Sequence, residues 1–464
     1  MLFALLACSS TTLDSGDTAD TGVPTSSAYA FQSALTGEDS VSYSGQVFRQ
    51  VLIDDMKTWL GSLTGRIDNG EVYPVEGEVQ ADLEFYLGFD SSTSGQLSIG
   101  ISTDPSTAQA VYDDISSDKD LWGKLAGNDP TGQHQDWSSD FVGWDADGVT
   151  SPESLVRHWV AQVDALAAAR VAGEVPQDPD GNPLSVVYLS AEGQNYRQLL
   201  EKFLRGAVAF SQGADDYLDD DIEGKGLNAD HTALEEGKAY TSLEHQWDEG
   251  FGYFGASRSY GDWSDEEIKA VYLDSDGDGA IDLTSEYCFG HSVNAAKRDL
   301  GAVVPTDYTA QAFGAFHAGR ALLAETAGSE LSAEQMSQLQ GHRDEAVAAW
   351  EASISSSVVH YINEVIVDTE AIGGEDYSFE DHAKHWSEAK GFALSLQFNP
   401  RSPLSDEDFL ALHQALGTAP VLADQDLEAR QAYIDGLLEA RALLAEAYGF
   451  DADNLGDEHG LGGW

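Results

Sequence analysis

The stretch FRQVLIDDMKTWLGSL at residues 48–63 decides the fold class of this chain. Its large apolar residues are Phe48, Val51, Leu52, Met56, Trp59, Leu60 and Leu63. Residues at these spacings line one face of an α-helix and leave the other face polar. The stretch therefore predicts a long amphipathic helix that packs against a core.

The same periodicity recurs along the chain. It is equally regular at 196–208 and 434–448. It is less regular in six further segments: 153–172, 232–254, 306–326, 333–366, 378–397 and 405–417. The alternation of apolar and polar residues that is typical of a strand occurs only in short segments such as residues 97–101. The sequence predicts an all-α protein of long helices, with loops at 126–150, 173–186 and 219–230.

Two pairs of short segments have similar sequences, which suggests an internal duplication. GQVFRQVL at 45–52 is similar to GQNYRQLL at 193–200, and WDEGFGY at 247–253 is similar to WSEAKGF at 386–392. Each of these similar segments is shorter than one helix. We expect one helical domain over 30–450 followed by a tail at 451–464, with two similar helical-bundle halves at about 30–220 and 230–450.

The chain has only two cysteines, and Cys8 is the one with a recognisable context. It ends the sequence LLAC at 5–8, which resembles the lipobox where bacterial lipoproteins are cleaved and lipidated. Residues 1–8 would then be a truncated signal, residues 9–29 a disordered tether, and Cys8 the lipid anchor to the outer membrane, facing the periplasm or the cell surface. The alternative is a flexible cytoplasmic N-terminus with a chance LLAC. Lipidation leaves Cys288 without a partner, as a small buried apolar residue.

Composition sets the limits on function. The 464 residues include 81 acidic and 23 basic side chains, for a formal net charge of −58. A hydrophobic content of 42% excludes wholesale disorder. Nucleic acid is not expected as a partner, because phosphates require clustered Lys and Arg. The acidic charge serves either solubility or the attraction of cations.

The most specific motif is DSDGDGAID at 274–282. Aspartates at loop positions 1, 3 and 5, a glycine at 6 and an aspartate at 9 match the start of an EF-hand-type calcium loop. The match is incomplete, because position 12 is Ser285 and the expected glutamate follows one place later as Glu286. We expect a structural calcium site; a polar Asp/Gly turn is the alternative. Its candidate ligands are Asp274, Asp276, Asp278, Ala280, Asp282 and Glu286.

A histidine and a carboxylate three or four residues apart on a helix can share a metal ion. In so acidic a chain this spacing arises often by chance. His245 and His385 differ from the rest because Trp, Gly and aromatic residues surround them, and His317 has a similar setting. Such surroundings indicate burial, and a buried carboxylate beside a histidine must be paired, hydrogen-bonded or ligated. His231, His342 and His360 lie in polar segments and are expected to be exposed.

Several of these segments resemble a family of bacterial surface lipoproteins related to the imelysins. The segments are 42–46, 197–206, 244–255, 274–299 and 385–400. The resemblance implies a helical fold of two bundle-like halves and a Gly-x-His-x-x-Glu motif associated with metal binding. The nearest match here is AKHWSE at 383–388, with alanine in place of glycine; LEHQWD at 243–248 is a partial match, and 314–320 has an arginine in place of the acid.

The expectation is a lipid-anchored, non-catalytic protein that holds iron or zinc between its halves, with a role in the acquisition of iron or another cation. The expected ligands are His245, Asp248, Glu249, His317, His382, His385 and Glu388. One alternative is a metallopeptidase that uses the same cluster, although neither His-Glu-x-x-His nor Gly-x-Ser-x-Gly occurs. The other is a cell-surface interaction module whose polar cluster is purely structural.

Overall fold

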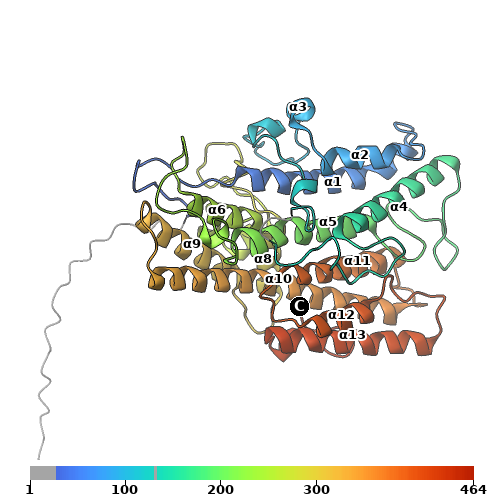
Figure 1. Cartoon of the computed structure of the whole chain (residues 1–464). Coiled ribbons are helices and arrows are strands. Elements are labelled where there is room, and N and C mark those ends of the chain that lie inside the picture. Colours follow the sequence, from blue (N-terminus) through green and yellow to red (C-terminus); the bar gives the residue numbers. More distant parts are fainter. Residues whose placement is uncertain (1–27, 130–132) are drawn as a thin grey trace, which may run out of the picture.

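The computed structural model describes residues 28–129 and 133–464, and helices dominate it (Figure 1). The helices are α1 (Ser44–Asp68), α2 (Glu78–Leu87), α3 (Ser91–Ser94), α4 (Pro152–Ala172), α5 (Tyr196–Leu204), α6 (Ser242–Phe254), α7 (Asp265–Lys269), α8 (Gly290–Gly301), α9 (Tyr308–Thr326), α10 (Ala333–Ala371), α11 (Phe379–Ser395), α12 (Asp406–Leu416) and α13 (Leu427–Tyr448). The predicted all-α class is confirmed. Cys8, the signal at 1–8 and most of the tether lie outside the described residues.

The described residues contain isolated β-bridges and no sheet. The segment 97–101 contributes a single bridge, between Ser98 and Val111. The helix expected over 232–254 begins only at Ser242, because Thr241 caps it. The Thr241 hydroxyl accepts a hydrogen bond from the Glu244 amide, and the Glu244 carboxylate accepts one from the Thr241 amide. This reciprocal capping box fixes the first turn. Helices α2 and α8 were not expected from the sequence.

The helices stack in layers, with α1, α2 and α4 at the top of Figure 1 and α12 and α13 at the bottom. The 39-residue α10 packs against α9 and α11, and α11 also packs against α5. Most buried apolar side chains, from Tyr29 to Trp464, form one continuous cluster, and a small second cluster includes Leu189 and Phe379. Tyr29, expected at the end of the tether, is therefore part of the core. Both expected halves share this core, and their duplication stays a prediction.

Helix α5 does not end where its α-helical hydrogen bonds end. It continues into two π-helical stretches, Arg205–Phe210 and Gly213–Tyr217. The backbone of α11 lies close to the first stretch, since a Cβ on Gly206 would lie 2.9 Å from Cα of Ser395. π-Bulges are rare and occur often at functional sites. Here they direct a buried run of aspartates, including Asp215 and Asp216, into the body of the protein.

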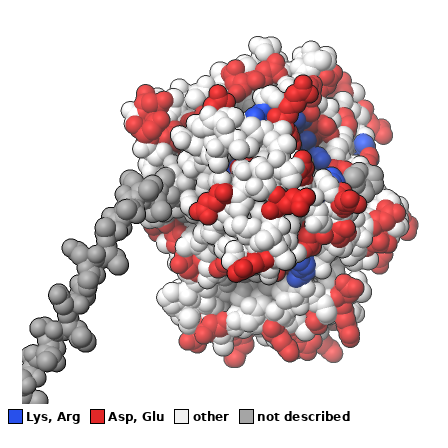
Figure 2. Space-filling model, turned by 60° about the vertical axis from the view of Figure 1, so that its left-hand side comes forward, with Lys and Arg blue, Asp and Glu red and all other residues white. Residues whose placement is uncertain are grey.

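The surface reflects the composition. Figure 2 shows acidic side chains across the displayed face, whereas Lys and Arg are few and several gather in one recess in the upper part of the view. Among the residues described, no helix combines the length and apolar character needed to cross a membrane.

Two expectations about single side chains have clear outcomes. Cys288 is a free, buried thiol, as expected, and burial raises its pKa to about 12. His231 was expected to be exposed, and this is wrong: its ring is buried between the hydroxyls of Thr241 and Thr326, at 2.8 and 3.0 Å. His342 and His360 are half-buried. The polar residues next to His231 in the sequence did not indicate that its ring is buried in the folded protein.

Candidate metal sites

The acidic loop that follows α7 brings carboxylates together. Asp274, Asp276 and Glu286 each offer a carboxylate oxygen, and these atoms lie within 4.8 Å of one another. Glu286 is buried, whereas Asp274 is half-buried and Asp276 is exposed. Glu286 thus takes the closing place in the loop, although it stands one residue later than an EF-hand predicts.

Backbone amides hold the loop in this shape. One Glu286 oxygen accepts the amides of Ser275 and Asp276, at 2.7 and 3.2 Å, and the other accepts the amide of Asp282 at 3.0 Å. Asp274 accepts the amides of Gly277 and Gly279. Both glycines have left-handed backbones, with φ of 73° and 87°, which favour glycine at these tight turns.

The other expected ligands of the loop lie in supporting places. Asp278 accepts the amide of Ala280 at 2.8 Å. Asp282 accepts two amides of the following turn and also the side-chain amide of Gln109, at 3.0 Å. The group of three converging carboxylates does not include Asp278 or Asp282. The loop is also anchored to the segment before it, since the Ala108 amide donates to the carbonyl of Ile281 at 2.9 Å.

The expected ligands on α6 are engaged elsewhere. Asp248 is fully buried and accepts Nε of Arg320 at 2.9 Å, the Tyr29 hydroxyl at 2.9 Å and the Ser42 amide at 3.0 Å. Arg320 also donates to Glu244 at 2.7 Å. Arg320 is therefore the counter-ion of two buried carboxylates.

The two histidines of this region have separate contacts. His245 has a ring nitrogen 3.0 Å from the carbonyl oxygen of Ser42, and its ring stacks on Tyr240. Its other nitrogen lies 3.9 Å from Glu249, whose carboxylate accepts the side-chain amide of Gln46. His317 lies against the ring of Phe31, at 5.0 Å between centroids.

The expected ligands on α11 also point to separate partners. A ring nitrogen of His385 lies 2.8 Å from the carboxylate of Asp368 on α10. Burial lowers the pKa of His385, but this hydrogen bond and the negative charges of Asp368 and Glu364 together outweigh burial and raise the pKa. Glu388 is buried 3.4 Å from the ammonium of Lys202. His382 is fully buried, and burial lowers its pKa to about 4.

The expectation of one centre that joins His245 to His385 is therefore not supported by the geometry. Helix α6 packs on α1 and α9, whereas α11 packs on α10 and α5. Among the described residues, two groups of three side chains have converging ligand atoms, and neither includes any of the seven residues expected to hold iron or zinc. All seven are buried or half-buried, as expected, and Asp248, His385 and Glu388 form hydrogen bonds or ion pairs with separate partners.

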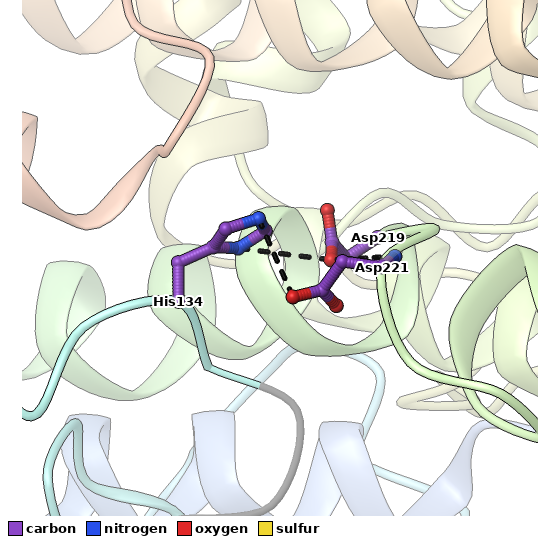
Figure 3. A group of neighbouring side chains, drawn as sticks. All are labelled: His134, Asp219 and Asp221. Atoms are coloured by element: carbon purple, nitrogen blue, oxygen red, sulfur yellow. Dashed lines mark hydrogen bonds and ion pairs between the residues drawn. The ribbon is translucent and has the colours of Figure 1, made fainter.

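The second of these groups was not foreseen. It consists of His134, Asp219 and Asp221, which point toward one another in Figure 3. Nδ1 of His134 lies 3.6 Å from Asp219, and its Nε2 lies 3.5 Å from Asp221. Asp215 contacts the same ring at 2.6 Å. His134 lies in a loop and the aspartates follow the π-helical end of α5, so no spacing rule connects them.

Burial disfavours the charged carboxylates at this second group. Burial raises the pKa of Asp215 to about 7, against the lowering effect of its hydrogen bond to His134. Burial also raises the pKa of Asp219, which Arg401 contacts at 2.5 Å. Burial lowers the pKa of His134, but the neighbouring carboxylates outweigh it and raise the pKa. A divalent cation would relieve the carboxylates and be held by both ligand types.

A large cavity lies beside α10 and α13. Its volume is about 870 Å³, and its walls include Tyr308, Arg401 and Trp464. The carboxylate of Glu351 lies at this cavity, fully engaged by Asn399, by Ser402 at 2.5 Å and by Tyr448 at 2.7 Å. Because its carboxylate oxygens accept these hydrogen bonds, Glu351 serves as a structural residue rather than as a free acid.

The fold and these groups define a class: an acidic all-α protein with two groups of side chains suited to cations. The chain belongs to the family described as a domain of unknown function, DUF4856, whose model matches residues 149–414, more than half of the chain. The match runs from just before α4 into α12 and includes the acidic loop, while His134 lies before it. No curated protein matches the chain, and no solved structure matches it.

Proposed function

We propose that this protein is a non-catalytic cation-binding protein whose principal site is a calcium site in the loop 274–286. One observation supports the proposal above all: carboxylate oxygens of Asp274, Asp276 and Glu286 lie within 4.8 Å of one another. Calcium prefers carboxylate and carbonyl oxygens, six to eight of them at roughly 2.3–2.6 Å. Asp278, Asp282 and the carbonyl of Ala280 are the residues that could complete such a shell.

The role of this calcium is structural. The two ends of the loop are joined by an antiparallel bridge between Tyr272 and Tyr287, and the Cys288 amide donates to the carbonyl of Val271 at 2.8 Å. An ion bound among the aspartates would connect this base to the loop tip. Because a cation that binds only the folded state stabilises it by mass action, calcium should raise the melting temperature.

The test compares melting with and without calcium after chelator treatment. At a calcium concentration about 100 times the dissociation constant, the expected gain is about 2.7 kcal/mol. Asp276→Ala should remove most of that gain, because it deletes one of the three converging carboxylates. Glu236→Gln, which removes one exposed acid outside the loop, is the matched control and should retain the gain. Equal melting of the wild type with and without calcium would refute the site.

We further propose that iron or zinc, if bound, is held at His134, Asp219 and Asp221 rather than at His245 and His385. The mixed imidazole and carboxylate set suits either metal. Zinc titration followed by calorimetry should give one site in the wild type that His134→Ala abolishes, whereas His385→Ala should leave it unchanged. Loss of binding in the His385 variant alone would restore the original ligand set.

The cellular setting belongs to the same proposal. The resemblance to imelysin-related lipoproteins and the LLAC sequence support a lipid anchor on Cys8, with the acidic body outside the cytoplasm and a role in the acquisition of iron or another cation. Labelling of cells with a palmitate analogue should modify the wild type and not Cys8→Ser.

The two alternatives are separated from this proposal by activity and by partner. Chelator-sensitive cleavage of unfolded substrates would favour a metallopeptidase. Capture of a protein or glycan partner that does not depend on calcium, His134 or the other histidines would favour an interaction module.

A further inference from the structure

A second pocket collects positive charge in this strongly acidic protein. It has a volume of about 490 Å³ and lies where α1, α5, α8 and α11 meet. Five basic side chains line it: Lys57, Arg197, Lys202, Arg205 and Lys297. Only two acids line it, Asp54 and Glu201, so its formal charge is 5 − 2 = +3. In a chain with a net charge of −58, this local sign is the opposite of the surroundings.

The acids in and around the pocket neutralise only part of this charge. Glu201 lies 3.0 Å from Lys57 and 2.6 Å from Lys202, and Glu388, outside the lining, lies 3.4 Å from Lys202. Asp54 pairs with Arg205. Within the described part of the chain, no carboxylate lies within 4.0 Å of a cationic nitrogen of Arg197 or Lys297. Nε of Arg197 donates to the carbonyl of Lys57 at 2.9 Å. The terminal nitrogens of Arg197 and the ammonium of Lys297 are therefore available to a ligand.

The inner end of the pocket offers further donors. Arg205 is 2% exposed, and its Nε is buried without a hydrogen-bond partner. Beside it begins α8, a 12-residue helix whose N-cap residue, Phe289, provides no side-chain cap. A Cβ on Gly290 would lie 2.6 Å from Cδ of Arg205, so glycine lets this guanidinium approach the first turn. Helix N-termini and guanidinium groups both favour oxyanions.

Part of the remaining wall is apolar. Tyr287, Val293 and Phe392 line it, and the ammonium of Lys202 lies 5.3 Å from the centre of the Phe392 ring. Val271, also in the lining, has a φ of 82°, which a β-branched residue rarely adopts. Such backbone strain is concentrated at functional sites. A pocket lined by both cations and aromatic rings fits a ligand that carries an anionic group and an apolar ring.

We propose that this pocket binds a small molecule that carries an oxyanion group next to an apolar ring. The oxyanion is held by Arg197, Lys297 and Arg205 at the N-terminus of α8, and the ring lies against Tyr287 and Phe392. The general field of the protein repels anions, but beyond about 10 Å that field is screened by physiological salt, whereas contacts inside the pocket are not.

The experiment measures binding by calorimetry with three probes: inorganic phosphate, phenyl phosphate and uncharged benzyl alcohol. Phenyl phosphate should bind the wild type most tightly, inorganic phosphate more weakly, and benzyl alcohol not measurably. In the double variant Arg197→Gln/Lys297→Gln the dissociation constant for phenyl phosphate should rise by about tenfold or more, since charged hydrogen bonds contribute that much.

The control removes the same charge elsewhere. Lys238→Gln/Lys269→Gln deletes two exposed cations outside the pocket and should change the dissociation constant less than about twofold. Circular dichroism shows whether both double variants are folded. The proposal is overturned if neither phosphate compound binds the wild type up to about 10 mM. It is equally overturned if the pocket variant, folded, binds phenyl phosphate as the wild type does.

Discussion

Replacement of Arg320 by methionine probes the buried ion network most sharply. Arg320 is fully buried, and its guanidinium donates to Asp248 at 2.9 Å, to Glu244 at 2.7 Å and to the Ser40 hydroxyl at 2.7 Å. Methionine fills most of the same space but leaves two fully buried carboxylates without their counter-ion. Breaking one buried pair costs about 3–5 kcal/mol, and we expect Arg320→Met to cost at least that much at pH 7.

The same change should make stability depend on pH. Burial already raises the pKa of Asp248, and Arg320 opposes that rise. Without Arg320 the folded-state pKa rises further above that of the unfolded chain. The unfolded state then releases its proton first as pH rises, so the variant loses stability with increasing pH and recovers part of its deficit near pH 5.

Urea unfolding followed by circular dichroism measures both effects. Arg157→Met is the control, because Arg157 is 45% exposed in its ion pair with Glu153 at 2.7 Å, and exposed pairs are worth about 0–1 kcal/mol. If Arg320→Met costs less than about 1 kcal/mol at pH 7, no more than this control, the buried network does not stabilise the fold as we argue.

Two further predictions concern the core. The ammonium of Lys390 is buried 2.9 Å from a ring nitrogen of His413, and burial lowers the pKa of Lys390 to about 7. Between pH 7 and 9 this lysine is protonated in the unfolded chain and largely deprotonated in the folded chain. The free energy of unfolding should therefore rise with pH, by at most about 1.4 kcal/mol per pH unit. In urea unfolding, Lys390→Met should abolish this rise, whereas Lys384→Met, at a lysine of α11 that is 43% exposed, should keep it. If the free energy of unfolding changes with pH equally in the wild type and both variants, Lys390 is not the source of the rise. On α9, a Cβ at Gly319 would lie 2.0 Å from Cζ2 of Trp247, whereas one at Gly314 meets nothing within 4 Å. Gly319→Ala should therefore destabilise by about 1–3 kcal/mol and Gly314→Ala should stabilise by up to about 1 kcal/mol, and equal effects in thermal melting would contradict the packing.

Hydrophobic periodicity revealed those helices whose buried face is apolar. α1 and α13 show that face plainly in the sequence. α8 does not, because its buried face consists largely of small and polar residues such as His291, Ser292, Ala295 and Ala296. The start of α6 was misplaced for a related reason: the capping contact between Thr241 and Glu244, rather than the apolar pattern, decides it.

The candidate sites divide in the same way. A site within one loop can be recognised from spacing, as with Asp274 and Asp276, although the closing Glu286 needed the folded loop to show that it reaches them. A site built from distant segments cannot. His134 and Asp219 are brought together only by the π-helical continuation of α5, and Arg320 reveals itself as the partner of Asp248 only in space.

The acidic loop is the centre of this account, and a crystal structure grown with calcium tests it most directly. We predict an ion in the loop 274–286, with carboxylate oxygens of Asp274, Asp276 and Glu286 at roughly 2.3–2.6 Å. A well-ordered loop in millimolar calcium, with the same three carboxylates and water in place of the ion, would contradict the account.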